Sequence, residues 1–501
     1  MNQEARPAEP QASLSRLAES VRRPHNLEAC LDALRAIFEA QAIDADRWRQ
    51  RNLGYHRMLA DQYRFLVPPG QRVLEVGCGD GDLLAALEPC FGVGVDLSPA
   101  MVERARHRHG SERLRFHAAA IEEIDLGEVV FDVIVMSDLV GYLYDIKAVL
   151  AGLLRHCHPR TRLVLNFHSR LWEPVFGLAE KLSLKAPRPV INWVTREDVD
   201  GLLRLAGFET VRSFARIVVP KRVPIVAPLV NRFLAPLWPF SHLCVANFVV
   251  ARPLLAPFPA DYRPRVSVVV PCRNEAGNIP AIVARVPDMG ASTEIVFVEG
   301  GSSDDTFERC LEAQRDNPGR AIQVHRQPGT GKGDAVRFGF SQATGDVLMI
   351  LDADMTVPPE DLDQFYDALV SGRVEMVNGS RLVYAMGAKA MRFLNLLGNK
   401  LFAWAFSFLL EQRVKDTLCG TKVLLREDYQ RIAAGRSVFG DFDPFGDFDL
   451  LFGAARRCLK IQDLPVRYRD RTYGDTNISR FRHGLLLLRM CWVALLRLKC
   501  R

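Results

Sequence analysis

The chain has 501 residues, of which 48% are hydrophobic and 25% charged, and its formal net charge is +6. These proportions are typical of folded globular protein and exclude a disordered or fibrous chain. The length exceeds one ordinary core of roughly 100–200 residues, so at least two domains are expected. The weak, dispersed charge does not indicate a nucleic-acid partner.

Cysteine usage and the first residues bear on the cellular compartment. The eleven cysteines are scattered without a C-x-x-C pair, so neither a zinc site nor a disulfide framework is predicted. Residues 1–15 contain no basic segment followed by an apolar core, and no stretch reaches the ~20 uncharged apolar residues of a spanning helix. We therefore expect a cytoplasmic protein with reduced thiols.

The first predicted elements are a helix and then a sheet. Residues 14–42 carry apolar side chains at helical spacing. From Arg72 onward short apolar runs alternate with helical segments, and these runs read RVLEVG, GVGVD and FDVIVM. This alternation is typical of βαβ units around a parallel sheet. The sheet is expected to end with NFVVARP at residues 247–253.

A proline-rich stretch separates this sheet from a second one. After it the same pattern resumes with RVSVVVP at 265–271, EIVFVEGG at 294–301 and DVLMILDAD at 346–354. The sequence therefore predicts two α/β domains. The expected division is a helical leader at 1–44, a first domain at 45–253, a linker at 254–264 and a second domain at 265–501.

A glycine-rich turn follows the first strand of the first domain. The segment LEVGCGDGDLL places Gly77, Gly79 and Gly81 between strand and helix, where they permit a tight turn and close approach of a ligand. Asp96 ends the next apolar run, where a carboxylate can accept both hydroxyls of a ribose. The same spacing occurs in dinucleotide-binding sheets, so a nicotinamide or flavin domain is the alternative at this point.

These motifs, together with FDVIVMSDLV at 131–140, resemble the class I S-adenosylmethionine-dependent methyltransferases over roughly residues 45–253. The resemblance implies a Rossmann-like sheet and S-adenosylmethionine as cofactor, with the glycine turn on its methionine part and Asp96 on its ribose. The family's usual aspartate for the adenine is missing, and Glu122 is the expected substitute. Candidates for a base toward the methyl acceptor are Asp138, Tyr142, Tyr144 and His168, each equally explained as a packing residue.

Polar segments follow the strands of the second domain. PCRNE at 271–275 and VEGGSSDDT at 298–306 combine carboxylates with a serine- and glycine-rich turn, which suits the base and ribose of a nucleotide. GTGKGDAVR at 329–337 offers a flexible loop with a positive charge for phosphate. The candidate donor contacts are Pro271, Glu275, Glu299, Ser302, Asp304 and Lys332.

A further strand of this domain ends in two carboxylates, Asp352 and Asp354. Oxygen ligands in this arrangement favour magnesium or manganese. Such an ion would neutralise the charge that develops on a nucleoside diphosphate leaving group, with Asp352 also facing the donor. A D-x-D pair alone is common by chance, but after two nucleotide-type segments it predicts a metal site.

These segments, with NGSR at 378–381, DTLCGTK at 416–422 and FGDFDLL at 445–451, resemble the family-2 glycosyltransferases of the GT-A fold over about residues 264–480. The resemblance is strongest to dolichol-phosphate mannosyltransferases and similar polyprenyl-phosphate sugar synthases. It implies a nucleotide site, a metal on the D-x-D pair and an acceptor-side acid at Asp447 or Asp449. The sequence departs from the family at Glu299, where aspartate is usual, and at TVPPE, which replaces SHPPE.

The acceptor decides which chemistry the protein must supply. A sugar hydroxyl needs a carboxylate to take its proton, which would be the role of Asp447 or Asp449. A lipid phosphate is already an anion and needs placement by basic residues, for which Arg381 and Lys422 are candidates. The segment YRDRTYGDTNISRFRHG resembles the family's arginine-containing loop, which implies Arg471 as a further donor contact.

Two apolar segments, residues 391–412 and 481–501, raise the question of a membrane. In the first, the polar residues fall on one face, and the second is broken by Arg489 and flanked by basic residues. Both patterns are typical of amphipathic helices at an anionic membrane surface, or of helices that cover a core or a dimer interface. Peripheral attachment to the inner face of the cell membrane is therefore one of two open expectations.

The leading hypothesis is a bifunctional enzyme of glycan or cell-wall biosynthesis. One domain would catalyse metal-dependent, inverting transfer of a sugar from a GDP- or UDP-linked donor to a polyprenyl phosphate or a glycan. The other would methylate a sugar, a lipid or a small molecule. Two alternatives stay open, a methyltransferase for an unrelated small molecule and a non-catalytic scaffold of the same fold.

Overall fold

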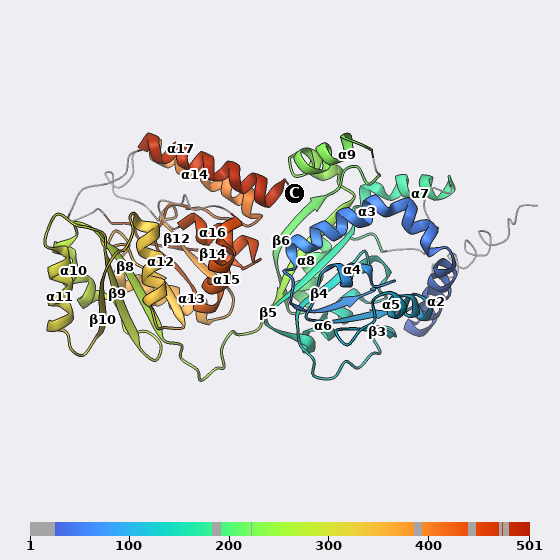
Figure 1. The fold of residues 1–501 in the computed structure, drawn as a ribbon, viewed down its shortest axis with the longest axis horizontal. Helices are drawn as coiled ribbons and strands as arrows, with labels where there is room; N and C mark the ends of the chain where they lie inside the picture. The colour runs from blue at the N-terminus through green and yellow to red at the C-terminus, as the bar shows by residue number, and fades with distance from the viewer. Residues whose placement is uncertain are drawn as a thin grey trace, which may run out of the picture. The chain divides into compact units, whose positions relative to one another are not determined.

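The computed structural model describes residues 26–182, 192–221, 223–384, 393–438, 447–469, 473 and 480–500, with the side chains of 393–397, 447 and 480–483 outside the description. The chain divides into two compact units, Met1–Leu255 and Ala256–Arg501 (Figure 1). Each unit is a sheet of seven described strands with helices packed on it. The predicted fold class, two successive α/β domains with a Rossmann-like sheet first and a GT-A-like sheet second, is confirmed.

The sheet of unit 1 has the strand order β3-β2-β1-β4-β5-β7-β6. Its strands are β1 (Arg72–Val76), β2 (Phe91–Asp96), β3 (Leu114–Ala118), β4 (Phe131–Ser137), β5 (Cys157–His168), β6 (Phe208–Arg216) and β7 (Ala246–Pro253). Strands β1 to β5 pair in parallel, and β7 is antiparallel to both β5 and β6. The carboxyl ends of every strand except β7 therefore lie at the same edge of the sheet.

The helices of unit 1 begin where the sequence supplies capping residues. Ser98 caps α5 with Pro99 at the first helical position, and Thr195 forms a capping box with Asp198 at the start of α8. The helices are α2 (Leu27–Ile43), α3 (Ala45–Leu66), α4 (Asp82–Ala86), α5 (Pro99–His109), α6 (Ile146–Leu153), α7 (Glu173–Lys181), α8 (Arg196–Leu205) and α9 (Val226–Leu229). Short turns of 3-10 or π type are η1 (Val140–Tyr142), η2 (Leu154–His156), η3 (Arg170–Trp172), η4 (Val230–Leu234) and η5 (Phe240–Leu243).

The N-terminal helix α2 packs into unit 1. Cys30, Leu34 and Ile37 form a small apolar cluster with Leu97 and Tyr142. The Glu39 carboxylate accepts hydrogen bonds from the Ser98 hydroxyl at 2.5 Å and from the Ala100 backbone nitrogen at 3.0 Å. The segment expected as a separate leader thus contacts the loop that follows β2.

The sheet of unit 2 is mixed, with the order β10-β9-β8-β11-β13-β12-β14. Its strands are β8 (Val266–Cys272), β9 (Thr293–Glu299), β10 (Ala321–Arg326), β11 (Val347–Ile350), β12 (Met376–Ser380), β13 (Lys422–Leu425) and β14 (Ile461–Pro465). Strands β8 to β11 are parallel, whereas β13 runs antiparallel to both β11 and β12. The carboxyl ends of β8, β9 and β11 consequently meet at one edge.

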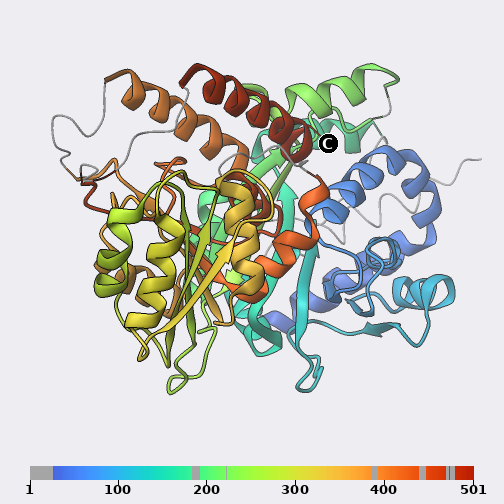
Figure 2. The same cartoon turned by 60° about the vertical axis from the view of Figure 1, so that its left-hand side comes forward.

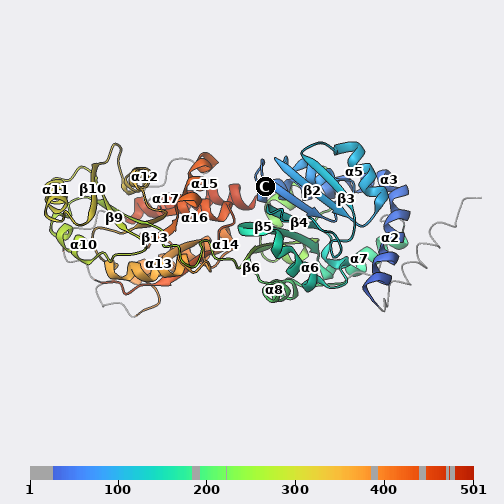
Figure 3. The ribbon, with the colours of Figure 1, turned by 90° about the horizontal axis from the view of Figure 1, so that it is seen from below.

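Helices cover both faces of this sheet. Gly339 of α12 lies against Val269, whereas Phe365 of α13 packs in the apolar cluster with Val268, whose side chain points to the opposite face of the strand (Figure 3). The helices are α10 (Ile279–Arg285), α11 (Thr306–Asp316), α12 (Lys332–Gln342), α13 (Leu362–Val370), α14 (Phe393–Leu410), α15 (Arg426–Ala434), α16 (Asp447–Arg456) and α17 (Arg480–Ala494). Short turns are η6 (Ala276–Asn278), η7 (Pro359–Asp361), η8 (Arg436–Val438) and η9 (Leu495–Lys499).

The two apolar segments noted in the sequence form α14 and α17, which lie side by side (Figures 1 and 2). Two polar residues of α14, Asn399 and Ser407, point inward, whereas Lys400 is exposed. Asn399 is buried and donates to Asp416 at 3.2 Å, and the Ser407 hydroxyl donates to the Ala403 and Val414 carbonyls. Trp404 of the same helix is 71% exposed. Within the described residues, no helix combines the length and apolar composition needed to cross a bilayer.

Candidate functional sites

A cavity of about 680 Å³ opens at the carboxyl edge of the unit 1 sheet. Its walls include the glycine turn after β1, Asp96 at the end of β2 and Glu122 after β3. Side chains from α2 and α3, among them Phe38 and Trp48, close the other side. The cavity therefore contains the residues that the sequence predicted for S-adenosylmethionine.

The glycine turn has a backbone that requires glycine. Gly77, Gly79 and Gly81 have φ angles of +75°, +52° and +77°, in the left-handed region that L side chains rarely adopt. A Cβ at Gly81 would also overlap the Phe116 ring. The Gly79 nitrogen donates to Asp96 Oδ2 at 2.8 Å, which holds the turn against the next strand end. The turn thus offers backbone groups to a ligand at close range.

Asp96 is held in a fixed orientation. Besides Gly79, the Ser98 nitrogen donates to Asp96 Oδ1 at 2.9 Å. Burial raises the pKa of Asp96, and the hydrogen bonds from Ser98 and Gly79 oppose that rise. Each carboxylate oxygen retains a second lone pair, so the group can still accept from ribose hydroxyls.

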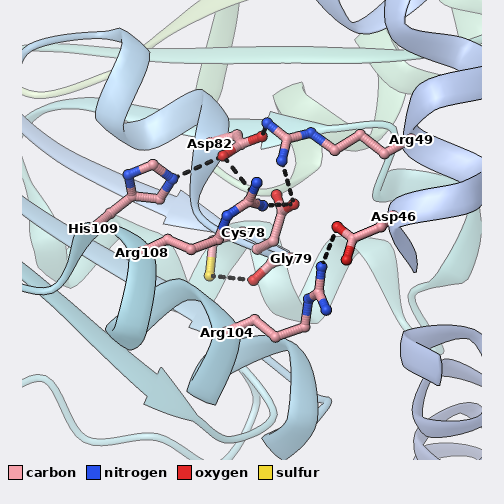
Figure 4. Close-up of polar contacts among 9 residues, drawn as sticks. Asp46, Arg49, Cys78, Gly79, Asp82, Arg104, Arg108 and His109 are labelled. Carbon is pink, nitrogen blue, oxygen red and sulfur yellow. Dashed lines mark hydrogen bonds and ion pairs between the residues drawn. The ribbon is translucent and has the colours of Figure 1, made fainter. Parts of the chain in front are cut away.

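Ion pairs brace the outer side of the glycine turn (Figure 4). Asp82 pairs with Arg49 of α3 and accepts from His109 Nε2 at 2.7 Å. Asp80 pairs with Arg108 at 2.7 Å. These contacts connect α3 and α5 to the turn, and they were not signalled by the sequence because the partners lie 27 to 33 positions away.

A buried carboxylate in the cavity wall tests whether a cationic cofactor fits. Glu75 on β1 is 2% exposed, and its Oε2 has no hydrogen-bond partner among the described residues. Burial raises the pKa of Glu75 well above its ordinary value. An unpaired buried carboxylate is costly, and an ammonium or sulfonium group beside it would relieve that cost. The site therefore fits the amino-acid end of S-adenosylmethionine.

Three of the four candidate base residues converge at the ends of β4 and β5. Asp138 accepts from the Tyr55 hydroxyl at 3.0 Å and from Asn166 Nδ2 at 2.6 Å. His168 Nδ1 lies 3.6 Å from Asp138 Oδ1. Asp138 and Tyr142 line the cofactor cavity and, with His168, a narrow second cavity.

The fourth candidate, Tyr144, is 46% exposed and lines neither of these cavities. Tyr55 was missed in the sequence, since it lies on α3, 83 positions before Asp138. Its ring stacks on His168 with centroids 6.0 Å apart.

Asp138 itself has φ +51°, a strained conformation that aspartate tolerates better than most residues.

In unit 2, the register of β8 and β9 sets the two nucleotide-type segments beside each other. Cys272 pairs with Glu299, and Pro271 lies one residue before Cys272 on β8. Beyond the strands, the Asn274 nitrogen donates to the Ser302 hydroxyl at 3.0 Å, and the Glu275 nitrogen to the Thr306 hydroxyl at 2.9 Å. The two loops after β8 and β9 therefore form one unit.

The acidic candidates of these loops are buried or bonded within the loops. Glu275 is 6% exposed and accepts from Asn278 Nδ2 at 2.7 Å. Glu299 is 5% exposed and accepts from the Ser302 nitrogen. Asp304 accepts from the Thr306 nitrogen and hydroxyl. These three carboxylates hold the loops in shape, whatever further contact they make with a nucleotide.

The D-x-D pair lies just beyond β11. Lys332, at the start of α12, pairs with Asp352 Oδ1 at 2.6 Å, while Asp354 Oδ1 accepts from the Thr356 hydroxyl at 2.9 Å. Burial opposes ionisation of Asp352, but the nearby Lys332 ammonium holds its pKa below the ordinary value. The phosphate-type lysine and the first metal-type carboxylate, predicted separately, are thus in contact.

The segment before β13 approaches this pair closely. A Cβ at Gly420 would overlap both Asp352 Oδ2 and Lys332 Nζ, so only glycine leaves both side chains in place. Lys422 is fully buried, and its Nζ donates to the Cys419 carbonyl at 2.5 Å. Its positive charge also lowers the pKa of Asp352, after the larger contributions of burial and Lys332.

Arg381 forms a bidentate pair with Asp416. Arg381 Nε and Nη2 lie 2.7 and 2.9 Å from the two carboxylate oxygens of Asp416, which is fully buried. The sequence did not signal this pair, because Asp416, within DTLCGTK, lies 35 positions after Arg381. Both cations predicted for an acceptor phosphate, Arg381 and Lys422, therefore have protein partners, and their contact with phosphate stays a prediction.

The catalytic and late-loop candidates are only partly described. Arg436 Nε donates to Asp449 Oδ2 at 2.7 Å, and the Asp449 side chain is 10% exposed. Asp447 begins α16, but its side chain lies outside the described residues, as does all of Arg471. In the described part of the chain, no three or more His, Cys, Asp or Glu side chains cluster as a ready-made metal site.

Comparison with protein-family models matches residues 267–431 to Glycosyl transferase family 2 and residues 46–213 to a methyltransferase domain. The chain is 30% identical over 221 residues to glycosyltransferase AglJ from Haloferax volcanii, covering 44% of this chain and 68% of that protein. It is 28% identical over 226 residues to the polyprenol monophosphomannose synthase of Mycolicibacterium smegmatis, covering 44% and 84%.

Among solved structures, a SAM-dependent methyltransferase from Thermotoga maritima matches with 18% identity and a TM-score of 0.35, covering 44% of this chain and 98% of that one. The Haloferax volcanii relative is matched at 30% identity over more than two thirds of its length. The chain therefore belongs to glycosyl transferase family 2, with a methyltransferase domain preceding the transferase domain.

Proposed function

We propose that unit 2 transfers a sugar, with inversion, from a nucleoside diphosphate donor to a polyprenyl phosphate or a glycan, and that unit 1 methylates a sugar, lipid or small molecule from S-adenosylmethionine. One observation supports the sugar-transferase function of unit 2 more strongly than any other. The loops after β8, β9 and β11 meet at one sheet edge, where Lys332 contacts Asp352. A cation and a carboxylate at that edge are what a metal-bound diphosphate needs.

Two carboxylates, Asp352 and Asp354, would hold magnesium or manganese together with the donor diphosphate, because hard cations prefer oxygen ligands. When bound, the ion would neutralise charge on the leaving diphosphate. Lys332 would contribute a positive charge to the same phosphates. Glu275 and Glu299 would keep the nucleotide loops in the shape that receives the base and ribose.

A polyprenyl phosphate acceptor is favoured by two observations. The Mycolicibacterium smegmatis relative is a polyprenol monophosphomannose synthase. In addition, α14 and α17 expose Leu401, Trp404, Leu485 and Trp492, while the polar side chains Asn399 and Ser407 of α14 are used inside unit 2. An outward apolar face with tryptophans is suited to the interface of a bilayer, where such an acceptor resides.

In unit 1, the chain's residues would bind and orient the cofactor and receive a proton from the acceptor. Glu75 would attract the cationic end of the cofactor, Asp96 would accept from its ribose, and the glycine turn would approach its backbone. Asp138, which accepts a hydrogen bond from Tyr55, and the neighbouring His168 would act as the base that takes a proton from the acceptor. S-adenosylmethionine supplies an activated methyl group, so alignment is the main task of the protein.

The transferase is tested with labelled GDP- and UDP-sugars, polyprenyl phosphate and a divalent ion, by measuring label in the organic phase. Asp352→Asn and Asp354→Asn should each reduce transfer to background. The matched control is Asp363→Asn, an exposed aspartate on α13 that should keep full activity. Undiminished transfer in excess chelator would remove the metal from the proposal.

A further inference from the structure

Two long excursions leave the unit 1 sheet at its ligand-binding edge. One spans residues 169–195, between β5 and α8, and the other spans 217–245, between β6 and β7. Because β5 and β6 both run antiparallel to β7, their carboxyl ends share an edge. That edge also carries Asp138, which follows β4.

Both excursions expose large apolar side chains. Leu171, Val175 and Leu178 are exposed in and before α7, with Leu178 at 59%. Leu229, Phe233 and Trp238 are exposed in the second excursion, with Trp238 at 79%. We call these six residues the apolar shelf. Monomeric soluble proteins rarely expose this many large apolar side chains on two adjoining segments, so a partner surface is indicated.

The two parts of the shelf are joined. Trp172 Nε1 donates to the Leu243 carbonyl at 3.0 Å, and the Ser169 nitrogen donates to the Val245 carbonyl at 2.8 Å. Figure 1 shows α7 and α9 at the same edge of unit 1. The shelf is therefore one region of the domain.

The charge of the second excursion points to the kind of partner. Residues 217–245 include Lys221, Arg222 and Arg232 but no aspartate or glutamate. Lys221 and Arg232 are exposed. The first excursion exposes Glu173 but also Arg170 and Lys181, so the exposed charges of the two segments are mainly basic. Exposed apolar and aromatic side chains among mainly basic ones match an anionic lipid surface.

The same elements form the wall of the acceptor region. Phe176, on the buried face of α7, packs edge-on against His168 with ring centroids 5.0 Å apart. Asn192 and Trp193 from the end of the first excursion line the narrow cavity with Asp138 and His168, which at about 10 Å³ has room for about one water molecule. The shelf elements therefore pack against the side chains next to Asp138, which also lines the cofactor cavity.

We propose that the apolar shelf rests on an anionic lipid layer and that the methyl acceptor of unit 1 is a lipid-anchored molecule whose polar head reaches Asp138 in the wall of the cofactor cavity. The inference rests on the proposed methyltransferase function and narrows its substrate to a lipid-linked class. It does not depend on α14 and α17, which belong to unit 2.

Lipid contact is tested in the full chain with Trp404 and Trp492 both replaced by phenylalanine, which removes the exposed tryptophans of unit 2. Vesicles of phosphatidylglycerol and phosphatidylcholine with brominated acyl chains should quench its fluorescence. Adding Trp238→Phe should remove most of the quenched component, and neutral vesicles should quench less. Identical quenching with and without Trp238 would overturn the proposal.

The acceptor class is tested with Leu229→Glu combined with Phe233→Glu. The wild-type chain should transfer methyl label from S-adenosylmethionine into the organic phase of a membrane extract. The double variant should transfer at least ten-fold less label. The control is Leu205→Glu, at an apolar and still more exposed position (71%) at the end of α8, and it should behave as wild type. S-adenosylmethionine affinity and sugar transfer should be unchanged in both variants, which shows that they are folded.

The outcomes separate the inference from the function on which it rests. If the wild-type chain binds no S-adenosylmethionine, the methyltransferase function itself fails. If it binds the cofactor but labels only water-soluble acceptors, or if the double variant labels lipid as well as wild type, the shelf proposal is wrong. If the double variant instead converts a dimer to a monomer in sedimentation, the shelf is a contact between copies, which also overturns it.

Discussion

At the scale of single residues, charge pairs dominate the site of unit 2. Lys332 contacts Asp352, Arg381 contacts Asp416, and Arg436 contacts Asp449. Glu75 differs because one of its carboxylate oxygens is buried without a partner. Paired and unpaired buried charges respond differently to substitution, and this difference yields two predictions.

The first concerns Glu75 and pH. Burial raises the pKa of Glu75, so at pH values between its ordinary and its raised pKa the free protein keeps a proton there that the unfolded chain has lost. A bound cation favours the ionised form, so binding releases that proton and cofactor affinity should rise as pH rises through the raised pKa. Glu75→Gln should weaken affinity about 10- to 100-fold, as expected for a lost charge-assisted contact of about 1.5–3 kcal/mol, and should flatten the pH dependence. Calorimetry in buffers of different ionisation enthalpy measures both effects.

The sign of that dependence is specific. The raised pKa of Glu75 favours the folded state at low pH, and this contribution is lost as pH rises through the folded-state pKa. The bound cofactor should therefore stabilise the folded protein against unfolding most at pH values near and above the raised pKa of Glu75. Affinity that falls with rising pH in the same range would contradict a role for Glu75 toward a cation.

The second prediction concerns the pair of Arg381 and Asp416. Asp416→Ala leaves the Arg381 guanidinium, whose side chain is 14% exposed, without its fully buried carboxylate partner, and removing one partner of a buried pair costs about 3–5 kcal/mol. The combined change Arg381→Met and Asp416→Leu should recover much of that loss, because no unpaired charge remains. Denaturant unfolding of the three chains measures the difference. Equal stability of Asp416→Ala and wild type would show that the pair is not structural.

At the scale of elements, the approach of the segment before β13 to the D-x-D pair matters most. Strand β13 runs antiparallel to β11, which brings Gly420 to the end of the strand that carries Asp352. Lys422, the buried lysine at the start of β13, adds positive charge near the same carboxylate. The geometry of the donor site therefore depends on a segment 68 positions later in the chain.

Gly420→Ala should separate Asp352 from Lys332, because the added methyl group overlaps both side-chain ends. We expect at least a ten-fold loss of sugar transfer with little change in unfolding, since flexible side chains can move aside. The comparison is Gly319→Ala, in a turn where an added Cβ meets nothing within 4 Å. Wild-type transfer by Gly420→Ala would show that the close approach is not needed.

At the scale of the whole molecule, the chain carries two separate sheets with separate sites. Asp96→Ala should abolish cofactor binding by unit 1 and leave sugar transfer intact, while Asp352→Asn should do the reverse. Each activity is measured in the full chain with the other as its folding control. Loss of both activities in either variant would mean that the sites are coupled.

The strands that sequence reasoning located are those buried on both faces. β1, β2, β4, β8 and β9 appear as continuous apolar runs, and their predicted and observed bounds agree within two residues. Strands such as β3 and β12 were not singled out. β3 is half exposed, and β12 reads MVNGS, with polar residues that are buried only in the folded unit.

The sequence by itself determined that two α/β domains follow each other and which motifs end their strands, because apolar runs followed by glycine or carboxylates report local backbone structure. Only the tertiary structure decided the partners. Tyr55 reaches Asp138, Gly420 reaches Asp352, and Asn399 of α14 reaches Asp416. These contacts join positions 17 to 83 residues apart, and strand order and helix packing, which bring them together, leave no trace in local periodicity.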